Sequence, residues 1–506
     1  MTNTLSTGDG ANGYRESACP VMSSRVQNGF GLLFLLRLSP VLFLLSGCAV
    51  GPNYQRPKVD VPVEYRDAER ASQQASIADL PWWEVFKDER LKNLVQTALA
   101  NNYDLRIAIT RIEQSRQLAA QARAQYFPFL NYSAGASYGK NEFVGAIVPS
   151  GDGGIERGAF AAVASASWEA DVWGRLRREN EAARAQYLGT EEARRGVMLS
   201  LVTDVAQAYF ELLELDLQLQ IARDTTQSFS QSLKLFNQRL EGGVASKLDT
   251  SRAAGALATA AASIPEIERQ IAIKENQINV LLGNNPGSIP HTAKLLEQVV
   301  PPDIPAGLPS ALLERRPDIL TAEQQLRSAN AQVGVATANF FPRIGLTALF
   351  GRASSPLSSL SSGQSTVWSI AGDVAGPIYQ GGALRAQKRQ SVAFWEQTKL
   401  QYEQTAQVAF QDVSNALVSR QKFEAIRDEQ AHAVEAYRES VKVSFQRYVA
   451  GKASYFEVLD AQLELYPAEN ALAATELSRR TVIVQLYKAL GGGWNLKDPD
   501  WATPKS

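Results

Sequence analysis

An uninterrupted helical run most constrains what this chain can fold into. Residues 383–450, which are 68 in number, contain neither glycine nor proline. At 1.5 Å per residue, a continuous helix of that length extends about 100 Å, longer than a single globular core. Apolar residues recur along it at spacings of three and four, for instance at Phe410, Val413 and Leu417. The sequence therefore predicts a helix that packs against other long helices, as in a coiled coil.

The chain also repeats itself, with a period near 210 residues. Residues 124–128 (AQYFP) are echoed by 338–342 (ANFFP), and residues 236–239 (FNQR) are echoed by 444–447 (SFQR). Chance does not keep a nearly constant offset across several motifs. We therefore predict a tandem duplication, with its join in a proline-rich connector over 284–309.

Each half is predicted to follow the same order of elements. A helix ends at a Phe-Pro step, two strands follow, and then a long helix turns back at a glycine to form a hairpin. Residues Leu130 to Tyr138 place apolar side chains at every second position, as a strand with one apolar face does. The predicted strands are 130–139, 161–173, 344–352 and 366–379. The predicted long helices begin at 174 and 382, and their return helices span 246–282 and 454–490.

Four strands cannot cross a membrane alone, because the two edges of an open sheet leave unpaired backbone groups in hydrocarbon. Closed membrane barrels begin at eight strands. If these strands do cross a membrane, several chains must share one barrel, and threefold symmetry would supply twelve strands. A small soluble sheet that caps a helical bundle is the alternative.

The N-terminus carries an export signal. An apolar run over 30–45 is followed by Leu45-Ser46-Gly47-Cys48, which resembles a bacterial lipobox in which Cys48 is lipidated and becomes the first mature residue. A transmembrane anchor is the alternative, but Arg37 and Pro40 interrupt the run. Removal of the leader leaves Cys48 as the single cysteine, so disulfides cannot stabilise the exported chain.

Composition argues against several functional classes. A net charge of -1 provides no electrostatic reason for a nucleic-acid partner, and 2 histidines are too few for a histidine-rich metal site. The sequence contains no glycine-rich phosphate loop after a strand, and neither an H-E-x-x-H nor a G-x-S-x-G motif. We expect neither an enzyme nor a cofactor other than a covalent lipid on Cys48.

Residues 312–319 (LLERRPDI) and the later Phe340-Phe341-Pro342 resemble the signature of the TolC-like outer-membrane efflux family. Residues 45–54 (LSGCAVGPNY) resemble its lipoprotein branch, the outer-membrane factors of RND pumps. The resemblance implies a mainly helical, tandem-duplicated channel: a homotrimer with a 12-stranded β-barrel in the outer membrane and a 12-helix tunnel in the periplasm. It also implies a periplasmic adaptor and an inner-membrane RND transporter as partners, and export of drugs or other toxic small molecules.

On this basis the chain divides into six segments. A signal peptide (1–47) precedes an extended, lipid-anchored tether (48–81) and the first repeat (82–283). The connector (284–309), the second repeat (310–492) and a C-terminal tail (493–506) follow.

The hairpin turns at 242–243 and 450–451 are expected to form the periplasmic tip. Ser246 and Ser454 each precede an acid by three residues, as the N-caps of capping boxes do. The resemblance implies that Tyr448 and Asp249 help to latch the tip and that Glu457 and Asp460 line its constriction. Arg252 could pair with Glu457 or Asp460 across the tip. Rings of these acids in a trimer would favour cations.

Two other functions stay open from the sequence. An exit duct for protein secretion would use a similar pore. A lipid-anchored coiled-coil scaffold would explain the lipobox and the helices, but would leave the duplicated strand pairs without a role.

Overall fold

The computed structural model describes residues 49–63, 65, 76–140, 142–143, 146–147, 156–290, 294–298, 307, 309–497 and 501. The chain divides into two compact units, Met1–Cys48 and Ala49–Ser506. The leader 1–47 and the lipidation residue Cys48 lie outside the described residues.

Four antiparallel strands form one sheet in the order β1-β4-β5-β6. They are β1 (Phe129–Lys140), β4 (Glu156–Ala170), β5 (Arg343–Ser354) and β6 (Thr366–Ala375). The two predicted strand pairs are confirmed, with different ends. β4 ends at Ala170 and β6 at Ala375, short of the predicted limits, and Pro377 beyond β6 has no N–H to donate to a ladder. A short pair that the sequence did not predict, β2 (Glu142–Phe143) and β3 (Ala146–Ile147), lies between β1 and β4.

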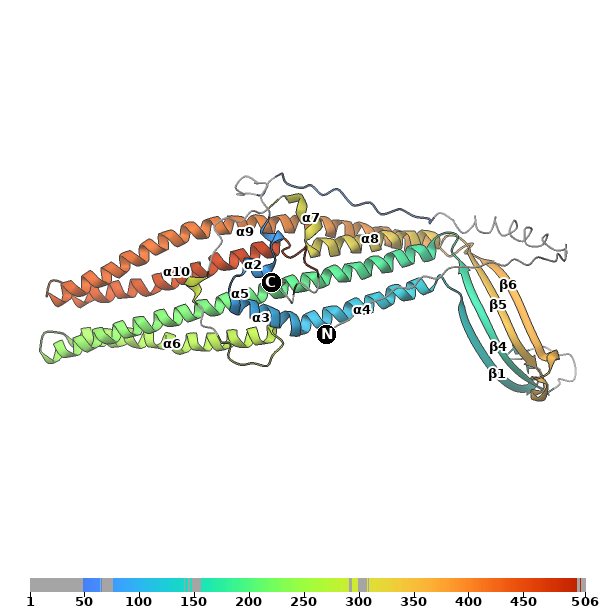
Figure 1. The fold of residues 1–506 in the computed structure, drawn as a ribbon, viewed down its shortest axis with the longest axis horizontal. Coiled ribbons are helices and arrows are strands. Elements are labelled where there is room, and N and C mark those ends of the chain that lie inside the picture. Colours follow the sequence, from blue (N-terminus) through green and yellow to red (C-terminus); the bar gives the residue numbers. More distant parts are fainter. Residues whose placement is uncertain are drawn as a thin grey trace, which may run out of the picture. The chain divides into compact units, whose positions relative to one another are not determined.

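Among the described residues, six long helices lie to one side of the sheet, and four of them connect to its strands (Figure 1). They are α4 (Tyr103–Ala124), α5 (Arg175–Glu241), α6 (Lys247–Leu281), α8 (Pro317–Ala338), α9 (Ala383–Val449) and α10 (Tyr455–Ala489). Near the sheet the neighbours are α4 with α5, α5 with α8, and α8 with α9, which is the order of the strands to which they connect. Beyond the ends of α4 and α8, α6 packs on α5, and α10 packs on both α9 and α5. The predicted 383–450 helix and the two predicted hairpins are confirmed.

Glycines set the ends of the long helices. Gly174 and Gly382 precede α5 and α9 with φ of 77° and 89°, which residues with a Cβ rarely adopt. At the opposite ends, Gly243 and Gly451 have φ of 74° and 72°. The N–H of each of these two glycines and of the next residue bonds back to the last helical turn, as in Schellman motifs. The turns predicted at 242–243 and 450–451 thus have a local cause.

The main apolar core lies where short elements pack against the middle of the long helices. The short elements are η1 (Ile77–Asp79), α2 (Trp82–Val85), α3 (Glu89–Asn101), η2 (Leu295–Glu297), η3 (Pro309–Ala311) and α7 (Leu312–Arg315). Two further short helices, η4 (Leu357–Ser359) and η5 (Gly363–Ser365), lie between β5 and β6. Trp82, Tyr209 and Tyr487 are completely buried in this core. α5 contains a window apolar enough to cross a membrane by length and composition, but 67% of that window is buried inside the chain. We therefore regard α5 as a core helix.

Of the predicted extended tether (48–81), residues 49–63 have no helix or strand, but Ile77–Asp79 form η1 and pack into the main core. The first part of 49–63 is fixed to the helices. Arg178 of α5 donates to the carbonyls of Val50 and Gly51 at 3.3 Å each and to Asn53 Oδ1 at 2.7 Å. Glu323 of α8, 3% exposed, accepts from Arg56 Nε at 2.9 Å and from Arg327 at 2.7 Å. This segment therefore bridges a helix of each repeat.

Candidate functional site

The sheet has two chemically different faces. In the register of the four strands, even-numbered residues pair with even-numbered residues throughout, so they share one face. Apart from small residues, that face carries Leu130, Tyr132, Tyr138, Phe160, Trp168, Ile344, Leu346, Phe350, Trp368, Ile370 and Val374, with polar residues only near the strand ends remote from the helices. Tyr132 is 88% exposed and Ile370 79% exposed, so the chain itself does not cover this apolar face.

The opposite face is polar and small. It carries mainly serine, glycine and alanine, with Asn131, Thr347 and a few apolar residues (Phe129, Val163, Leu349 and Val367). Three of its charged residues, Glu169, Arg343 and Asp373, lie at the strand ends next to the helices. Strands that alternate an apolar outer face with a polar inner face are the pattern of a barrel in a membrane. The apolar face is suited to lipid and the polar face to a water-filled lumen.

The sheet has two open edges. Within the described strands, β1 and β6 each pair on one side only. Because the strands are antiparallel and even in number, β6 of one copy could pair antiparallel with β1 of the next. Hydrocarbon does not tolerate open edges, so the apolar face implies closure by further copies of this chain.

At the far end of the helices, an aromatic cluster joins the two hairpins. Phe236 of α5 is completely buried, and its ring centre lies 5.3 Å from that of Tyr448 and 4.0 Å from that of Tyr455. Val458 and Ala253, both nearly inaccessible, add contacts from α10 and α6. All four helices of the two hairpins therefore contribute to one small core, which we call the tip cluster (Phe229, Phe236, Ala253, Ala260, Tyr448, Tyr455, Val458 and Leu459).

Arg239 contacts the tip cluster at its surface and links the two hairpins. Its guanidinium carbon lies 4.4 Å from the Tyr448 ring centre, within the range of a cation–π contact. Its two terminal nitrogens donate to the carbonyls of Tyr448 and Val449, both at 3.4 Å. Arg239 of the first repeat therefore binds the C-terminal end of α9, where the helix dipole favours a cation.

The predicted tip residues have mixed outcomes. The capping box of Ser246 and Asp249 is confirmed, because the Ser246 side chain accepts from the Asp249 N–H and the Asp249 carboxylate accepts from the Ser246 N–H. The equivalent prediction for Ser454 is wrong. Ser454 is the N-cap residue of α10, but its side chain makes no capping hydrogen bond to the described helix. Glu457 instead pairs with Arg447 at 3.5 Å, because its longer side chain reaches back across the turn.

The proposed cross-tip pairs of Arg252 are also not formed. Within the described residues of the chain, Arg252 makes no ion pair with Glu457 or Asp460, and both acids are exposed. Arg252 and Asp249 instead lie close enough to Tyr455 to influence it. Burial raises the pKa of Tyr455 most, and the nearby Asp249 and Tyr448 raise it further, while Arg252 acts in the opposite direction. The resulting pKa of Tyr455 is about 12. Tyr455 therefore stays neutral at physiological pH.

Sequence reasoning missed Arg239, Phe236 and Tyr455. A partial signal was available, since Arg239 and Arg447 occupy equivalent repeat positions. The equivalence of the two positions does not show that Arg239 contacts Tyr448 of the other hairpin, whereas Arg447 pairs with Glu457 of its own hairpin. The difference arises from packing between hairpins.

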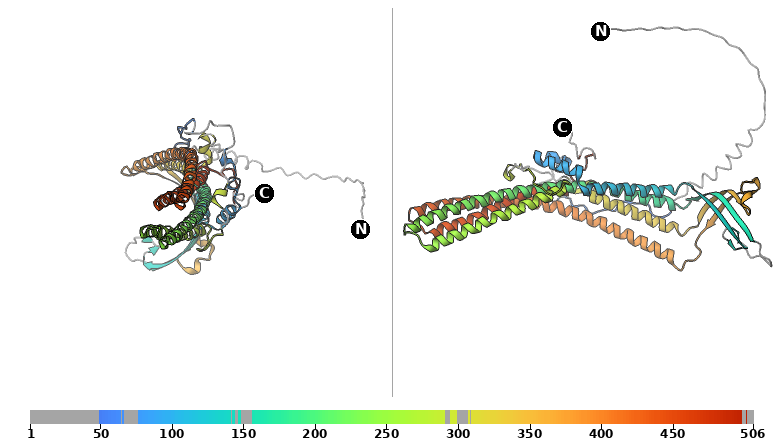
Figure 2. Two further views of the ribbon diagram at one scale, coloured as in Figure 1. Left: turned by 90° about the vertical axis from the view of Figure 1, so that its left-hand side faces the viewer. Right: turned by 90° about the horizontal axis from the view of Figure 1, so that it is seen from below.

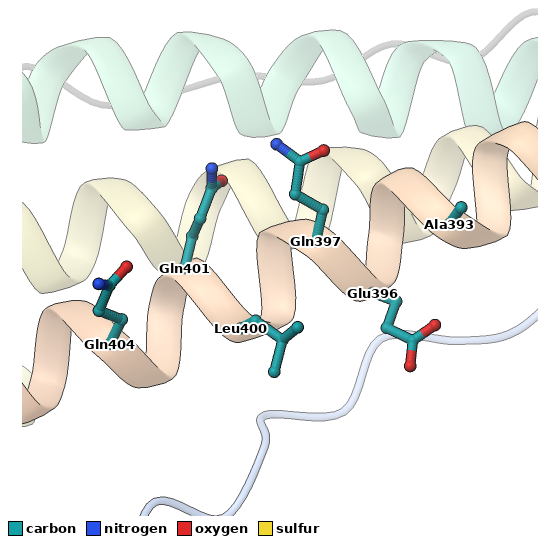
Figure 3. Close-up of a pocket in the computed structure, with 6 residues that line it drawn as sticks. All are labelled: Ala393, Glu396, Gln397, Leu400, Gln401 and Gln404. Atoms are coloured by element: carbon teal, nitrogen blue, oxygen red, sulfur yellow. The ribbon is translucent and has the colours of Figure 1, made fainter.

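The structure offers little that could bind a metal or a small molecule tightly. Among the described residues, no group of three or more His, Cys, Asp or Glu side chains is arranged to hold a metal ion. A hollow of about 550 Å³ lies along α9 and is lined by Ala393, Glu396, Gln397, Leu400, Gln401 and Gln404 (Figure 3). These side chains all come from one helix, so the hollow is an open surface.

Comparison with known proteins gives consistent results. The family described as outer membrane efflux protein matches residues 94–284 and 308–492. The chain is 36% identical over 466 residues to the probable efflux pump outer membrane protein TtgC of Pseudomonas putida, covering 91% of this chain and 96% of that one. It is 34% identical over 461 residues to the cation efflux system protein CusC of Escherichia coli, covering 90% and 97%. The open-state crystal structure of the Neisseria gonorrhoeae MtrE outer membrane channel superposes with a TM-score of 0.79 at 30% identity, over 88% of this chain and 99% of that one.

Proposed function

The chain belongs to the outer membrane efflux protein family and is the outer-membrane channel of a tripartite efflux pump, and from this premise we propose that three copies form one channel that exports small organic toxicants through a closable helical tip. The observation that carries the proposal is the two-faced sheet with two open edges. Its apolar face needs lipid, and its edges need further strands.

A homotrimer meets both needs. Three copies of four strands make twelve, which exceeds the minimum for a membrane barrel. The same β6-to-β1 contact, repeated around an axis, would place α9 of one copy beside α4 and α6 of the next. Such head-to-tail contacts form a ring when the rotation closes.

We assign the anchor to a lipid on Cys48. Ala49 lies against Gly174, at the junction between β4 and α5, and the Val50 N–H donates to the Trp173 carbonyl at 3.0 Å. The chain therefore leaves the described region beside the end of the sheet that faces the helices. A lipid attached one residue earlier would enter the membrane leaflet next to that end.

The tip is the end that opens. The two hairpins of each chain meet there through the tip cluster and Arg239, a contact that is small compared with the main core. A periplasmic adaptor and an inner-membrane RND transporter would engage the helical part and supply the energy for export. In this role the chain needs no catalytic residue and no cofactor.

Organic molecules are the proposed cargo. The relatives include proteins named for toluene and solvent efflux as well as a cation efflux protein. The whole sequence contains 3 Met, 2 His and 2 Cys, and the thioether, imidazole and thiolate groups of these residues are the side-chain ligands that copper ions bind. This scarcity favours organic toxicants over copper or silver.

Three measurements test the proposal. The native mass of the lipidated protein in detergent should equal three protomers, and planar bilayers containing it should show channel conductance. Deletion of the gene should raise the sensitivity of cells to toluene and hydrophobic antibiotics, and leave sensitivity to copper unchanged. A monomer without conductance would refute the channel, and increased sensitivity only to metals would refute the organic cargo.

A further inference from the structure

The two repeats differ sharply in charge where their long helices leave the sheet. In the first repeat, residues 169–181 contain three arginines and four acids. The equivalent residues of the second repeat, 377–389, contain Arg385, Lys388 and Arg389 and no acid. In fact no acidic residue occurs from 374 to 395. The start of α9 therefore carries three uncompensated positive charges.

The three arginines of residues 169–181 each form an ion pair within the chain. Arg175 pairs with Glu169 at 2.9 Å, Arg177 with Asp171 at 3.2 Å, and Arg178 with Glu181 at 2.8 Å. In the second repeat, Arg385 and Arg389 are exposed and Lys388 is half-buried. None of these three forms an ion pair with any described residue. The described residues therefore supply no counter-ion to this cluster.

An adjacent copy does not supply those counter-ions. In the proposed assembly, α9 lies beside α4 of the next copy, and both helices approach the sheet at the same end. The part of α4 at that end, residues 114–124, contains no acid, and the exposed Arg123 lies in its last turn. Assembly would therefore add a fourth positive charge to the cluster.

The cluster lies beside the apolar face of the sheet. Between β6 and α9, Ile378 is fully exposed and Tyr379 is 88% exposed, and apolar and aromatic residues followed by basic ones are typical of the membrane interface. Arg385, Arg389 and Glu396 lie on one face of α9, because they are four and then seven residues apart. In Figure 3, Glu396 points to the side along which the extended N-terminal segment (pale blue) runs. That segment follows the proposed lipid anchor, so this is the outer side of the helices.

We propose that Arg385, Lys388 and Arg389 bind the phosphate groups of anionic phospholipids, such as phosphatidylglycerol, in the leaflet that faces the helices. Figure 2, seen from below, shows α9 meeting the sheet at one margin of the protomer, which is the margin that β1 of the next copy would join. The bound headgroups would neutralise the charge that the first repeat neutralises with its own acids. The site requires that the strands cross the membrane, and it does not depend on the cargo or on the tip.

The test measures lipid preference directly. The full-length, lipidated protein is placed in vesicles of phosphatidylethanolamine with a minority of phosphatidylglycerol. Electron spin resonance then compares the binding of spin-labelled phosphatidylglycerol with that of spin-labelled phosphatidylcholine. We expect a preference of roughly threefold or more for phosphatidylglycerol. It should disappear in the triple variant Arg385→Gln, Lys388→Gln, Arg389→Gln, and should weaken in high salt, which shortens the screening length.

A matched control removes the same charge elsewhere. Lys234, Lys247 and Lys422 are exposed and form no ion pair with the described residues, and Lys422 lies about 55 Å along α9 from Arg385. Changing these three to glutamine should leave the preference intact. Equal binding of both lipids to the wild type, or a preference that survives the first triple variant, would overturn the proposal. So would a changed ion selectivity of the channel with unchanged lipid binding, because the cluster would then face the lumen. Conductance of the wild type tests the channel separately.

Discussion

Replacing Arg239 with glutamine should loosen the contact between the two hairpins at the tip. The guanidinium lies 4.4 Å from the ring centre of Tyr448, and a partly exposed cation–π contact of this kind contributes about 1 kcal/mol. Its two hydrogen bonds to the end of α9 are long, at 3.4 Å, and contribute about 0.5 kcal/mol each. Glutamine loses both the charge and the planar stacking, so the closed tip of each chain should be destabilised by about 2 kcal/mol.

Since 1.4 kcal/mol corresponds to a factor of ten, this loss shifts the equilibrium between closed and open tips by about 30-fold per chain. If the three tips of a trimer open together, the three contributions multiply. Single-channel recording in planar bilayers should show a higher open probability for Arg239→Gln. Cells that carry this variant should admit large antibiotics that the closed channel excludes. The thermal stability of the protein should change little, because the main core is distant from the tip.

Arg447→Gln is the matched control. Arg447 occupies the equivalent position of the second repeat, but pairs at 3.5 Å with Glu457 of its own hairpin, and both side chains are about half exposed. Exposed pairs of this kind contribute at most about 1 kcal/mol. The control should leave the open probability near that of the wild type. Equal effects of the two variants, or a larger effect of Arg447→Gln, would show that the hairpins are not held together by Arg239.

Three further changes test other parts of the molecule. Ile370→Arg, on the apolar face of β6, should cost about 2–4 kcal/mol and reduce the amount of assembled protein in the outer-membrane fraction, whereas Ala371→Arg on the polar face should be tolerated. Glu323→Gln removes the buried negative charge that pairs with two arginines, which are 37% and 43% exposed and can rehydrate, so we expect a loss of about 1–2 kcal/mol and faster proteolysis of residues 49–63. Burial raises the pKa of Glu214 to about 7 from 4.5, so its ionisation destabilises the folded state increasingly as the pH rises through that interval, by up to about 3 kcal/mol. Glu214→Gln should therefore raise the melting temperature at pH 8 and leave it unchanged at pH 4.

The helices and strands follow from local signals in the sequence. The absence of glycine and proline over 383–450 predicts α9 to within a residue at each end. Gly243 and Gly451 predict the turns, because a left-handed residue after a helix favours glycine. Alternation of apolar and polar residues likewise predicts the two faces of β1, since successive side chains of a strand point to opposite sides. These effects act between residues that are close in the chain, so they do not depend on how the helices and strands pack together.

Contacts between the repeats depended on the tertiary structure. Ser246 and Ser454 begin similar Ser-x-x-acid patterns, yet only the first forms a capping box, because Glu457 reaches Arg447 instead. Arg239 and Arg447 are equivalent in the repeat, yet only Arg239 lies on the other hairpin's tyrosine. Which of two similar side chains finds a distant partner depends on the distance between helices that are some 200 residues apart in the chain. Residue types and spacings along the chain do not contain that distance, because it is set only when all four helices pack together.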